Sequence, residues 1–423
     1  MQRKGSKGNN MNKIYSSMAT IVDAHCGKGK TSWAIQYINE HPEKRFLFIT
    51  PFLEEVKRIK RDCPEADFKA PDNEFKSKSS HLKDLLESEA NVVSTHSLFT
   101  RVDIETRELL RMGKYTLILD EVMDIVHQEC VNADDIKILK NEGLLVIDSE
   151  TGKVSTTDCA KTYTGVFREL IEKAKSGRLV CFNNTFLLWQ FPPEVFEELA
   201  ESFVLTYLFK GQIQRCYFDY HEIPYRMQGV TGSREDGYKL TPYDPENDDR
   251  ELRDWLKDNL HIYEGKLNDI GDKGLSHTWH SQYKSSKRVM NKLKNATYNY
   301  FNNVLNGEGS DRMWTTFKVT EQMLKGKGYT KGFVPHNARA TNDYSDKKHL
   351  AYLVNRFLPP GLVNYFKDRE VCINADLFAV SEMIQWIFRS AIRNRESIHL
   401  YVPSERMRRL LISWIEGSLL PQK

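Results

Sequence analysis

The sequence from Thr20 to Thr31, TIVDAHCGKGKT, joins a short apolar run to a loop of small and basic residues. A helical stretch, Thr31–Asn39, follows directly. In a P-loop, the backbone N–H groups of such a loop surround phosphate oxygens at the N-terminus of a helix. Strand, loop and helix fall where that motif requires them, although Ala24 occupies the position of its first glycine. The stretch predicts a phosphate-binding loop in a parallel α/β domain.

The residue types of this loop suggest individual roles. Gly27 and Gly29 give the backbone its freedom, Lys30 reaches the β- and γ-phosphates, and the Thr31 hydroxyl binds Mg²⁺. We therefore expect a nucleotide to be bound by one continuous segment, consisting of Gly27, Lys28, Gly29, Lys30, Thr31 and Ser32.

An acidic pair follows another strand-like run, YTLILDE, which ends in Asp120 and Glu121. Next to a phosphate loop, a carboxylate at the carboxyl end of a buried strand can coordinate Mg²⁺, and a second can orient and deprotonate a water molecule. We assign the metal role to Asp120, together with Thr31, and the water-activating role to Glu121. These residues predict hydrolysis of a nucleoside triphosphate.

The wider pattern supports two domains in the 423 residues, a length too great for one ordinary core. Apolar runs alternate with helical stretches up to about residue 208, as in a parallel sheet with crossover helices. We expect a RecA-like domain over residues 11–211, interrupted by an insertion at about 124–177 that contains the hairpin LLVIDSETGKVSTT. The strand-like runs are MATIVDA, RFLFITP, NVVSTH, YTLILDE, RLVCFNN and SFVLTYL.

A second RecA-like α/β domain is expected over residues 212–423, with a nucleotide cleft between the two domains. It begins with a polar insertion at about 228–285, and a helix is expected over Ser286–Leu305. Residues 1–10 are polar and basic and are expected to form a disordered arm. Further strands are expected at Met313–Phe317, Gly332–Pro335, Val371–Asn374 and Ser397–Val402.

Composition excludes several classes of protein. The hydrophobic fraction of 40% and charged fraction of 28% are those of a folded globular chain. A net charge of +3 means that a nucleic-acid partner would have to bind a local basic surface. The seven cysteines are scattered and contain no CxxC pair, which suits reduced thiols in a cytoplasm. No apolar run is long enough to span a bilayer, so no membrane partner is expected.

Near the C-terminus, the segment QWIFRSAIR places Gln385, Arg389 and Arg393 at steps of four residues, on one face of an expected helix over 385–395. An arginine directed at a γ-phosphate from another domain stabilises transition-state charge, and it makes hydrolysis depend on domain closure. Gln385–Leu410 carries six arginines against two glutamates, so positive charge is concentrated here.

The order of the motifs along the chain resembles that of the superfamily-2 helicases, which include the DEAD- and DEAH-box proteins. The resemblance is greatest to helicases of bacteriophages and prophages. AHCGKGKT is similar to motif I, FITPFLEEVKRI to Ia, VSTHSLF to Ib and DEVM to II. LTYLF resembles motif III, WTTFK motif IV, FVPHNARATNDY motif V and QWIFRSAIR motif VI. The second arginine of motif VI is displaced by one position, and no upstream adenine-reading glutamine motif is evident.

The resemblance implies roles for further residues. Arg389 and Arg393 become candidates for the arginine finger, Gln385 for a nucleotide-sensing residue, and Thr206 for coupling hydrolysis to domain movement. The residues that would bind the nucleic-acid backbone are Thr50, Pro51, Thr95, His96, Thr316, Asn337, Arg339, Thr341 and Asn342.

The expected function is an ATP- and Mg²⁺-dependent helicase or translocase acting on single-stranded or branched DNA, with RNA as the alternative substrate. Replication proteins are the further expected partners, and the expected location is the cytoplasm, that of a bacterial host if the gene belongs to a phage. Two alternatives remain open at this point. One is a P-loop motor or loader that acts on a protein or in DNA packaging; the other is a binding module without catalysis.

Overall fold

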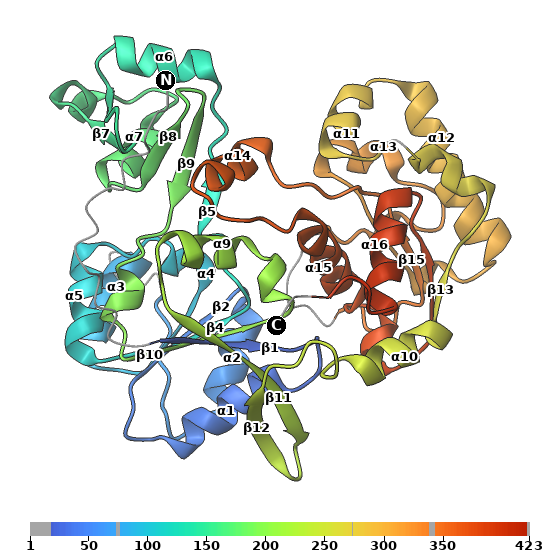
Figure 1. Cartoon of the computed structure of the whole chain (residues 1–423), viewed down its shortest axis with the longest axis horizontal. Coiled ribbons are helices and arrows are strands. Elements are labelled where there is room, and N and C mark those ends of the chain that lie inside the picture. Colours follow the sequence, from blue (N-terminus) through green and yellow to red (C-terminus); the bar gives the residue numbers. More distant parts are fainter. Residues whose placement is uncertain (1–17, 73–76, 273, 338–342, 421–423) are drawn as a thin grey trace.

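The computed structural model describes residues 18–72, 77–272, 274–337 and 343–420. Two α/β domains with parallel sheets lie side by side, and a smaller domain is attached to the first (Figure 1). This architecture confirms the expected fold class of two RecA-like domains. The arm expected at residues 1–10 lies outside the described residues.

The first sheet contains seven strands in the order β12-β11-β1-β10-β4-β2-β3, and all of its pairings are parallel except that of β11 with β12. Its central strands are apolar and buried on both faces, as crossover helices require. The strands are β1 (Ala19–Asp23), β2 (Phe46–Thr50), β3 (Val92–Thr95), β4 (Thr116–Asp120), β10 (Glu201–Thr206), β11 (Tyr225–Ser233) and β12 (Gly237–Pro242).

Helices cover this sheet. The crossover helices present an apolar side to the strands, as Trp33, Ala34 and Ile38 do in α1. The helices are α1 (Lys30–Glu40), α2 (Leu53–Asp62), α3 (Lys78–Glu87), α4 (His96–Phe99), α5 (Ile104–Gly113), α8 (Val195–Glu198) and α9 (Ile213–Tyr220), with a 3₁₀ turn at Phe209–Gly211.

The small domain occupies residues 126–190, between β4 and β10 of the first sheet (Figure 1). It has an antiparallel sheet in the order β5-β9-β8 and the expected hairpin, β6-β7, which is confirmed. Its elements are β5 (Val126–Gln128), α6 (Ala133–Asn141), β6 (Leu145–Ile147), β7 (Val154–Thr156), a 3₁₀ turn at Asp158–Thr162, α7 (Arg168–Lys175), β8 (Leu179–Phe182) and β9 (Phe186–Gln190).

The second domain has a parallel sheet in the order β13-β16-β15-β14. Its strands are β13 (Leu260–Ile262), β14 (Arg312–Thr315), β15 (His349–Tyr352) and β16 (Ile398–Tyr401). Its helices are α10 (Arg250–Asn259), α11 (His277–Tyr283), α12 (Lys287–Asn299), α13 (Glu321–Leu324), α14 (Pro360–Asp368), α15 (Ala375–Ile387) and α16 (Glu405–Ile415), with a π-helical turn at Tyr300–Val304 and 3₁₀ turns at Lys266–Gly271, Gly309–Asp311, Lys318–Thr320, Thr330–Gly332 and Ala391–Asn394.

The expected domain limits need correction. Residues 225–242, expected in the second domain and partly in its polar insertion, form the β11–β12 hairpin on the edge of the first sheet. The boundary therefore follows Pro242 instead of residue 211. The insertion in the first domain also extends beyond 177, because RLVCFNN forms β8 of the small sheet and not a strand of the main one.

Two further expected strands are wrong, while the helix at 286–305 is confirmed as α12 and its π-helical turn. Gly332–Pro335 makes a single bridge, Trp314 to Phe333, next to a proline that has no N–H to donate. Val371–Asn374 connects α14 to α15, and its Val371 and Ile373 side chains pack on the core of the first domain.

Helix α14 links the second domain to the rest of the molecule. Its Leu362, Tyr365 and Phe366 side chains belong to the core shared by the first and small domains. The Gln190 amide of β9 donates a 2.6 Å hydrogen bond to the Tyr365 hydroxyl. The chain thus leaves the second sheet after β15, docks on the small domain and returns as α15 (Figure 1).

Candidate nucleotide-binding site

The loop between β1 and α1 has the geometry of a phosphate-binding loop. Gly27 and Gly29 have φ values of 86° and 100°, which only glycine adopts without strain. The Lys30 ammonium donates hydrogen bonds to the loop's own carbonyls, 2.6 Å to Ala24 O and 3.2 Å to His25 O. The lysine is therefore held over the concave side of the loop, where an anionic group would be bound.

The acidic pair lies beside this loop. The Thr31 hydroxyl donates to Asp120 Oδ1 at 3.3 Å, across 89 positions of sequence. Burial, with the neighbouring Glu121 charge as the next contribution, raises the pKa of Asp120 to about 7. Two oxygen ligands, one hydroxyl and one carboxylate, are what a hard cation such as Mg²⁺ prefers, so these residues fit the expected metal.

Glu121 adopts a left-handed conformation, with φ 66°, at a cost of about 1–2 kcal/mol for a non-glycine residue. Its N–H donates to Leu205 O at 2.8 Å, which holds this turn. The side-chain atom Oε2 is buried and has no hydrogen-bond partner within the described residues. A strained, incompletely satisfied carboxylate in a pocket is typical of a functional group.

The carboxyl end of β10 contacts both parts of this site. Thr206 O accepts a 3.1 Å hydrogen bond from Ala24 N at the start of the loop, and Leu205 O accepts the one from Glu121. The Thr206 hydroxyl is buried without a partner in the part of the chain that the structure describes. After Thr206, Tyr207 and Leu208 enter the core of the second domain. Thr206 thus lies between the loop, the acidic pair and the second domain, and its coupling role stays a prediction.

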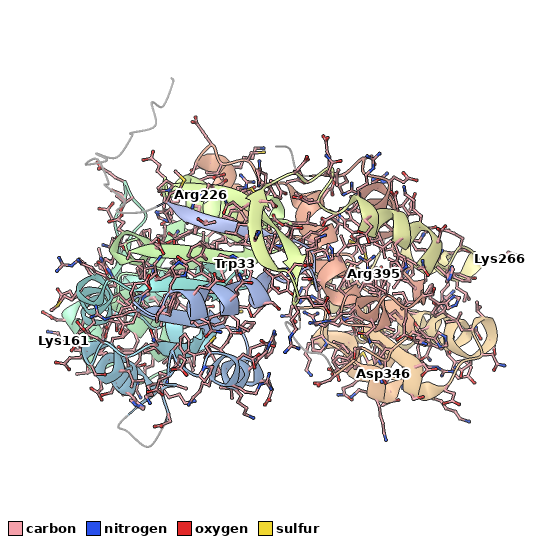
Figure 2. The ribbon with its side chains drawn as sticks, turned by 90° about the horizontal axis from the view of Figure 1, so that it is seen from below. Trp33, Lys161, Arg226, Lys266, Asp346 and Arg395 are labelled. Atoms are coloured by element: carbon pink, nitrogen blue, oxygen red, sulfur yellow. The ribbon has the colours of Figure 1, made fainter. Side chains whose placement is uncertain are left out.

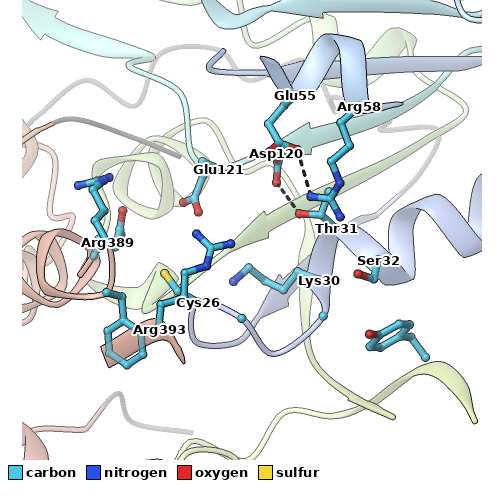
Figure 3. Close-up of a pocket in the computed structure, with 15 residues that line it drawn as sticks. Cys26, Lys30, Thr31, Ser32, Glu55, Arg58, Asp120, Glu121, Arg389 and Arg393 are labelled. Carbon is cyan, nitrogen blue, oxygen red and sulfur yellow. Dashed lines mark hydrogen bonds and ion pairs between the residues drawn. The ribbon is translucent and has the colours of Figure 1, made fainter. Parts of the chain in front are cut away.

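A single pocket brings the two domains together. The first domain contributes the loop, Thr31, Ser32, Asp120 and Glu121, and the second contributes Gln385 with both arginines (Figure 3). In Figure 3, Arg389 and Arg393 come from the side opposite Thr31 and Ser32. The lining residues are Cys26, Gly27, Gly29, Lys30, Thr31, Ser32, Glu55, Arg58, Asp120, Glu121, Tyr238, Gln385, Phe388, Arg389 and Arg393. Lys28 lies in the same loop but outside this lining.

The arginine segment differs from the expected helix over 385–395. Helix α15 ends at Ile387, and a 3₁₀ turn, Ala391–Asn394, carries Arg393. The break lets Arg389 lie buried at 6% exposure while Arg393 is exposed toward the pocket. Gln385 Nε2 is buried and has no hydrogen-bond partner among the described residues.

Five lining residues were not among the predicted site residues, and they are Cys26, Glu55, Arg58, Tyr238 and Phe388. Arg58 and Glu55 form an ion pair of 3.2 Å on α2, beside Thr31 (Figure 3). Tyr238 comes from the β11–β12 hairpin, which the polar sequence did not reveal. Glu55 and Arg58 lie three apart within the segment similar to motif Ia, FITPFLEEVKRI, and this spacing is the available signal for these two residues.

Asp23, the last residue of β1, is a further group that the sequence analysis did not use. It is 2% exposed and accepts 2.8 Å hydrogen bonds from the N–H groups of Leu208 and Phe209. Burial raises its pKa to about 7 in spite of these bonds, and the nearby Asp249 carboxylate adds to the effect. Asp23 therefore ties the strand before the loop to the segment that follows β10.

The residues expected to contact nucleic acid differ in their exposure to solvent. Thr50 is buried and donates to Asp120 Oδ2 at 3.5 Å, so it belongs to the acidic site. Thr316 is also buried, 3.2 Å from the Thr320 hydroxyl. Pro51, Thr95 and His96 are half-buried and Asn337 is exposed. Arg339, Thr341 and Asn342 lie outside the described residues.

His96, one of these predicted nucleic-acid residues, contacts the acidic pair, because its Nε2 lies 2.9 Å from Asp120 O.

The seven cysteines, all within the described part of the chain, form no disulfide bonds. None of the described helices is long and apolar enough to cross a membrane.

Comparison with known proteins identifies the family. Residues 254–415 match the family model described as the YonV C-terminal Rossmann-like domain, and residues 126–189 match that of the YonV middle domain. The chain is 40% identical over 412 residues to the SPbeta prophage-derived uncharacterized protein YonV of Bacillus subtilis (strain 168), covering 94% of this chain and 98% of that protein. The chain belongs to the YonV family.

The YonV middle domain corresponds to the small domain, and the C-terminal model begins within α10. The prophage origin of the relative agrees with the phage and prophage resemblance of the sequence. Among solved structures, the chain is similar to an XPD helicase, with 12% identity, a TM-score of 0.44 and coverage of 95% of this chain and 94% of the other. It is also similar to Xpd4 of S. tokodaii, with 11% identity, a TM-score of 0.45 and coverage of 95% of each chain.

Proposed function

We propose that this protein hydrolyses ATP with Mg²⁺ and uses the hydrolysis to move along single-stranded nucleic acid, with DNA as the expected substrate, and to separate strands. One observation carries the proposal: the pocket combines a phosphate loop and an acidic pair from one domain with Gln385, Arg389 and Arg393 from the other. A group bound there contacts both domains at once.

This geometry supports a division of roles. Lys30 and the loop N–H groups would bind the phosphates, and Thr31 with Asp120 would hold Mg²⁺, which neutralises phosphate charge. Glu121 would orient the attacking water and accept its proton. An arginine from the second domain would stabilise the charge that develops on the transferred group, so hydrolysis would require closure.

Contacts between the domains supply a path for coupling. The Tyr207 hydroxyl, one residue after Thr206, donates to Asp249 Oδ2 at 2.7 Å. Gln212 donates to the Ser381 hydroxyl of α15 at 2.9 Å, and α15 carries Gln385. A change at the carboxyl end of β10 can thus reach the helix that faces the nucleotide from the second domain. Pro51, Thr95, His96 and Asn337 are the described candidates for contact with the nucleic-acid backbone that are not buried.

The proposal predicts that single-stranded polynucleotide stimulates ATP hydrolysis several-fold or more. Phosphate release by the purified full-length chain would be measured with single-stranded DNA, duplex DNA and RNA, with a Glu121→Gln variant as the baseline for contaminating activity. Stimulation by DNA above RNA supports the DNA assignment. A rate that is unchanged across all polynucleotides would contradict the nucleic-acid motor and favour a P-loop ATPase that acts on a protein partner.

A further inference from the structure

The pocket has a second end, away from the arginines, and an aromatic side chain borders it. Tyr238 lines the same pocket as Lys30 and Thr31, but it belongs to β12, which packs along helix α1. The arginines and Glu121 occupy the end where a γ-phosphate would be attacked. A nucleotide whose triphosphate lies on the loop, with its γ-phosphate at that end, would place its base at the other end, toward Ser32 and Tyr238.

The hairpin that presents Tyr238 is held to α1 through its backbone. Gln36 accepts a 2.7 Å hydrogen bond from Tyr238 N and donates one of 3.3 Å to Tyr238 O. The amide also donates to Glu40 Oε1 at 2.9 Å. Because Gln36 lies about 1.7 turns beyond Lys30 on the same helix, these bonds fix the backbone of Tyr238 relative to the phosphate loop.

The ring lies directly against Gly29. A Cβ atom added to Gly29 would be 2.3 Å from Tyr238 Cε1, so only glycine leaves room for the ring at this position. Strand β12 itself begins with a glycine, Gly237, which follows the hairpin turn and has φ 78°. Loop, helix and hairpin together place one half-buried aromatic side chain beside the nucleotide pocket.

This placement suits stacking by a nucleobase. Aromatic side chains bind bases through their faces, and a purine offers the larger face. The Gln36 amide, which holds the backbone of Tyr238, uses both its oxygen and its nitrogen on the hairpin and on Glu40. It is thus engaged elsewhere and does not read the edge of a base.

We propose that Tyr238 is the platform on which the purine base of the bound nucleoside triphosphate stacks. The assignment rests on the proposed function, because it takes the loop at Lys30 as the triphosphate site. It names the substrate class of that site as purine nucleotides and makes the β11–β12 hairpin a specificity element.

The test compares ligands with and without a base. Binding of non-hydrolysable ATP and GTP analogues and of inorganic tripolyphosphate, each with Mg²⁺, would be measured by calorimetry on the full chain. Tyr238→Ala is expected to lower the affinity for both purine analogues by about ten- to a hundredfold. The affinity for tripolyphosphate should stay within about twofold, because it has no base to stack. Tyr238→Phe should retain purine binding, and Tyr298→Ala, at an exposed tyrosine of α12, is the matched control.

The outcomes separate this inference from the proposed function. An equal loss of tripolyphosphate affinity in Tyr238→Ala would show that the ring only supports Gly29, and it would overturn the stacking assignment. Unchanged purine affinity in that variant would overturn it as well. Wild-type protein that binds neither tripolyphosphate nor nucleotide would contradict the proposed function itself.

Discussion

Lys30→Ala is expected to lower kcat for ATP hydrolysis by about 10²–10³-fold, as the loss of one preorganised donor to a developing charge does in other enzymes. Lys30 is 8% exposed, and the loop holds its ammonium in place through Ala24 O and His25 O. Steady-state phosphate release at saturating Mg²⁺ and ATP measures this effect.

Two controls make the Lys30 result interpretable. Lys137→Ala removes an exposed lysine from α6 of the small domain and should hydrolyse ATP like the wild type. Circular dichroism should show that Lys30→Ala keeps its fold, and this control is needed because the two hydrogen bonds of the charged ammonium are worth about 1.5–3 kcal/mol each. A folded Lys30→Ala protein with normal turnover would refute the assignment of this loop as the phosphate-binding site.

Arg393→Ala is expected to lower kcat by about 10³-fold or more while ATP still binds, which is the behaviour of an arginine finger. Arg393 is exposed on the 3₁₀ turn after α15, and its side chain reaches toward Lys30 and Glu121 (Figure 3). Arg389→Ala should also reduce kcat, because Arg389 lines the same pocket from a buried position. Single-turnover hydrolysis, together with equilibrium binding of an ATP analogue, separates chemistry from affinity.

Arg409→Ala is the matched control for the arginines, since it removes an exposed arginine from α16. It should leave both binding and turnover unchanged. If Arg389→Ala and Arg393→Ala both hydrolyse ATP at the wild-type rate, the second domain contributes no catalytic cation and motif VI has been misplaced.

The parts of the site that were predictable from sequence lie within continuous segments. The strand of Asp23, the loop and α1 are adjacent in the chain, so composition and order suffice to place Lys30 and Thr31. Asp120 follows a fully buried run of apolar residues, and a parallel sheet brings the ends of such runs to one edge. The 3.3 Å bond from Thr31 to Asp120 follows from that topology.

Other parts depend on how distant segments meet. The β11–β12 hairpin is polar because it lies on the edge of the sheet, with exposed residues along both strands, so its sequence reads as a loop. Strands β13 and β15, with three and four residues, were not predicted, whereas the equally short β14 and β16 overlap the predicted runs Met313–Phe317 and Ser397–Val402. Tyr238 could not be assigned to the pocket without knowing that this hairpin crosses α1.

The predicted nucleic-acid contacts also depend on the three-dimensional structure. Side chains that carry nitrogen and oxygen atoms project from both domains in the view of Figure 2. The near-neutral net charge of +3 is consistent with this distribution. Thr50 and Thr316 match motif positions by sequence, yet both are buried, because the strand ends that carry them turn their hydroxyls toward neighbouring polar groups.

ATP-driven strand displacement is the most direct test of the proposed motor activity on nucleic acid. A labelled strand annealed to a partner with a 3′ or a 5′ single-stranded tail would be mixed with the full-length chain, Mg²⁺ and ATP, and its release followed by fluorescence. We expect release that requires ATP and one of the two tails, and that is lost in Glu121→Gln. No displacement or movement on either tail, by protein that hydrolyses ATP, would contradict it.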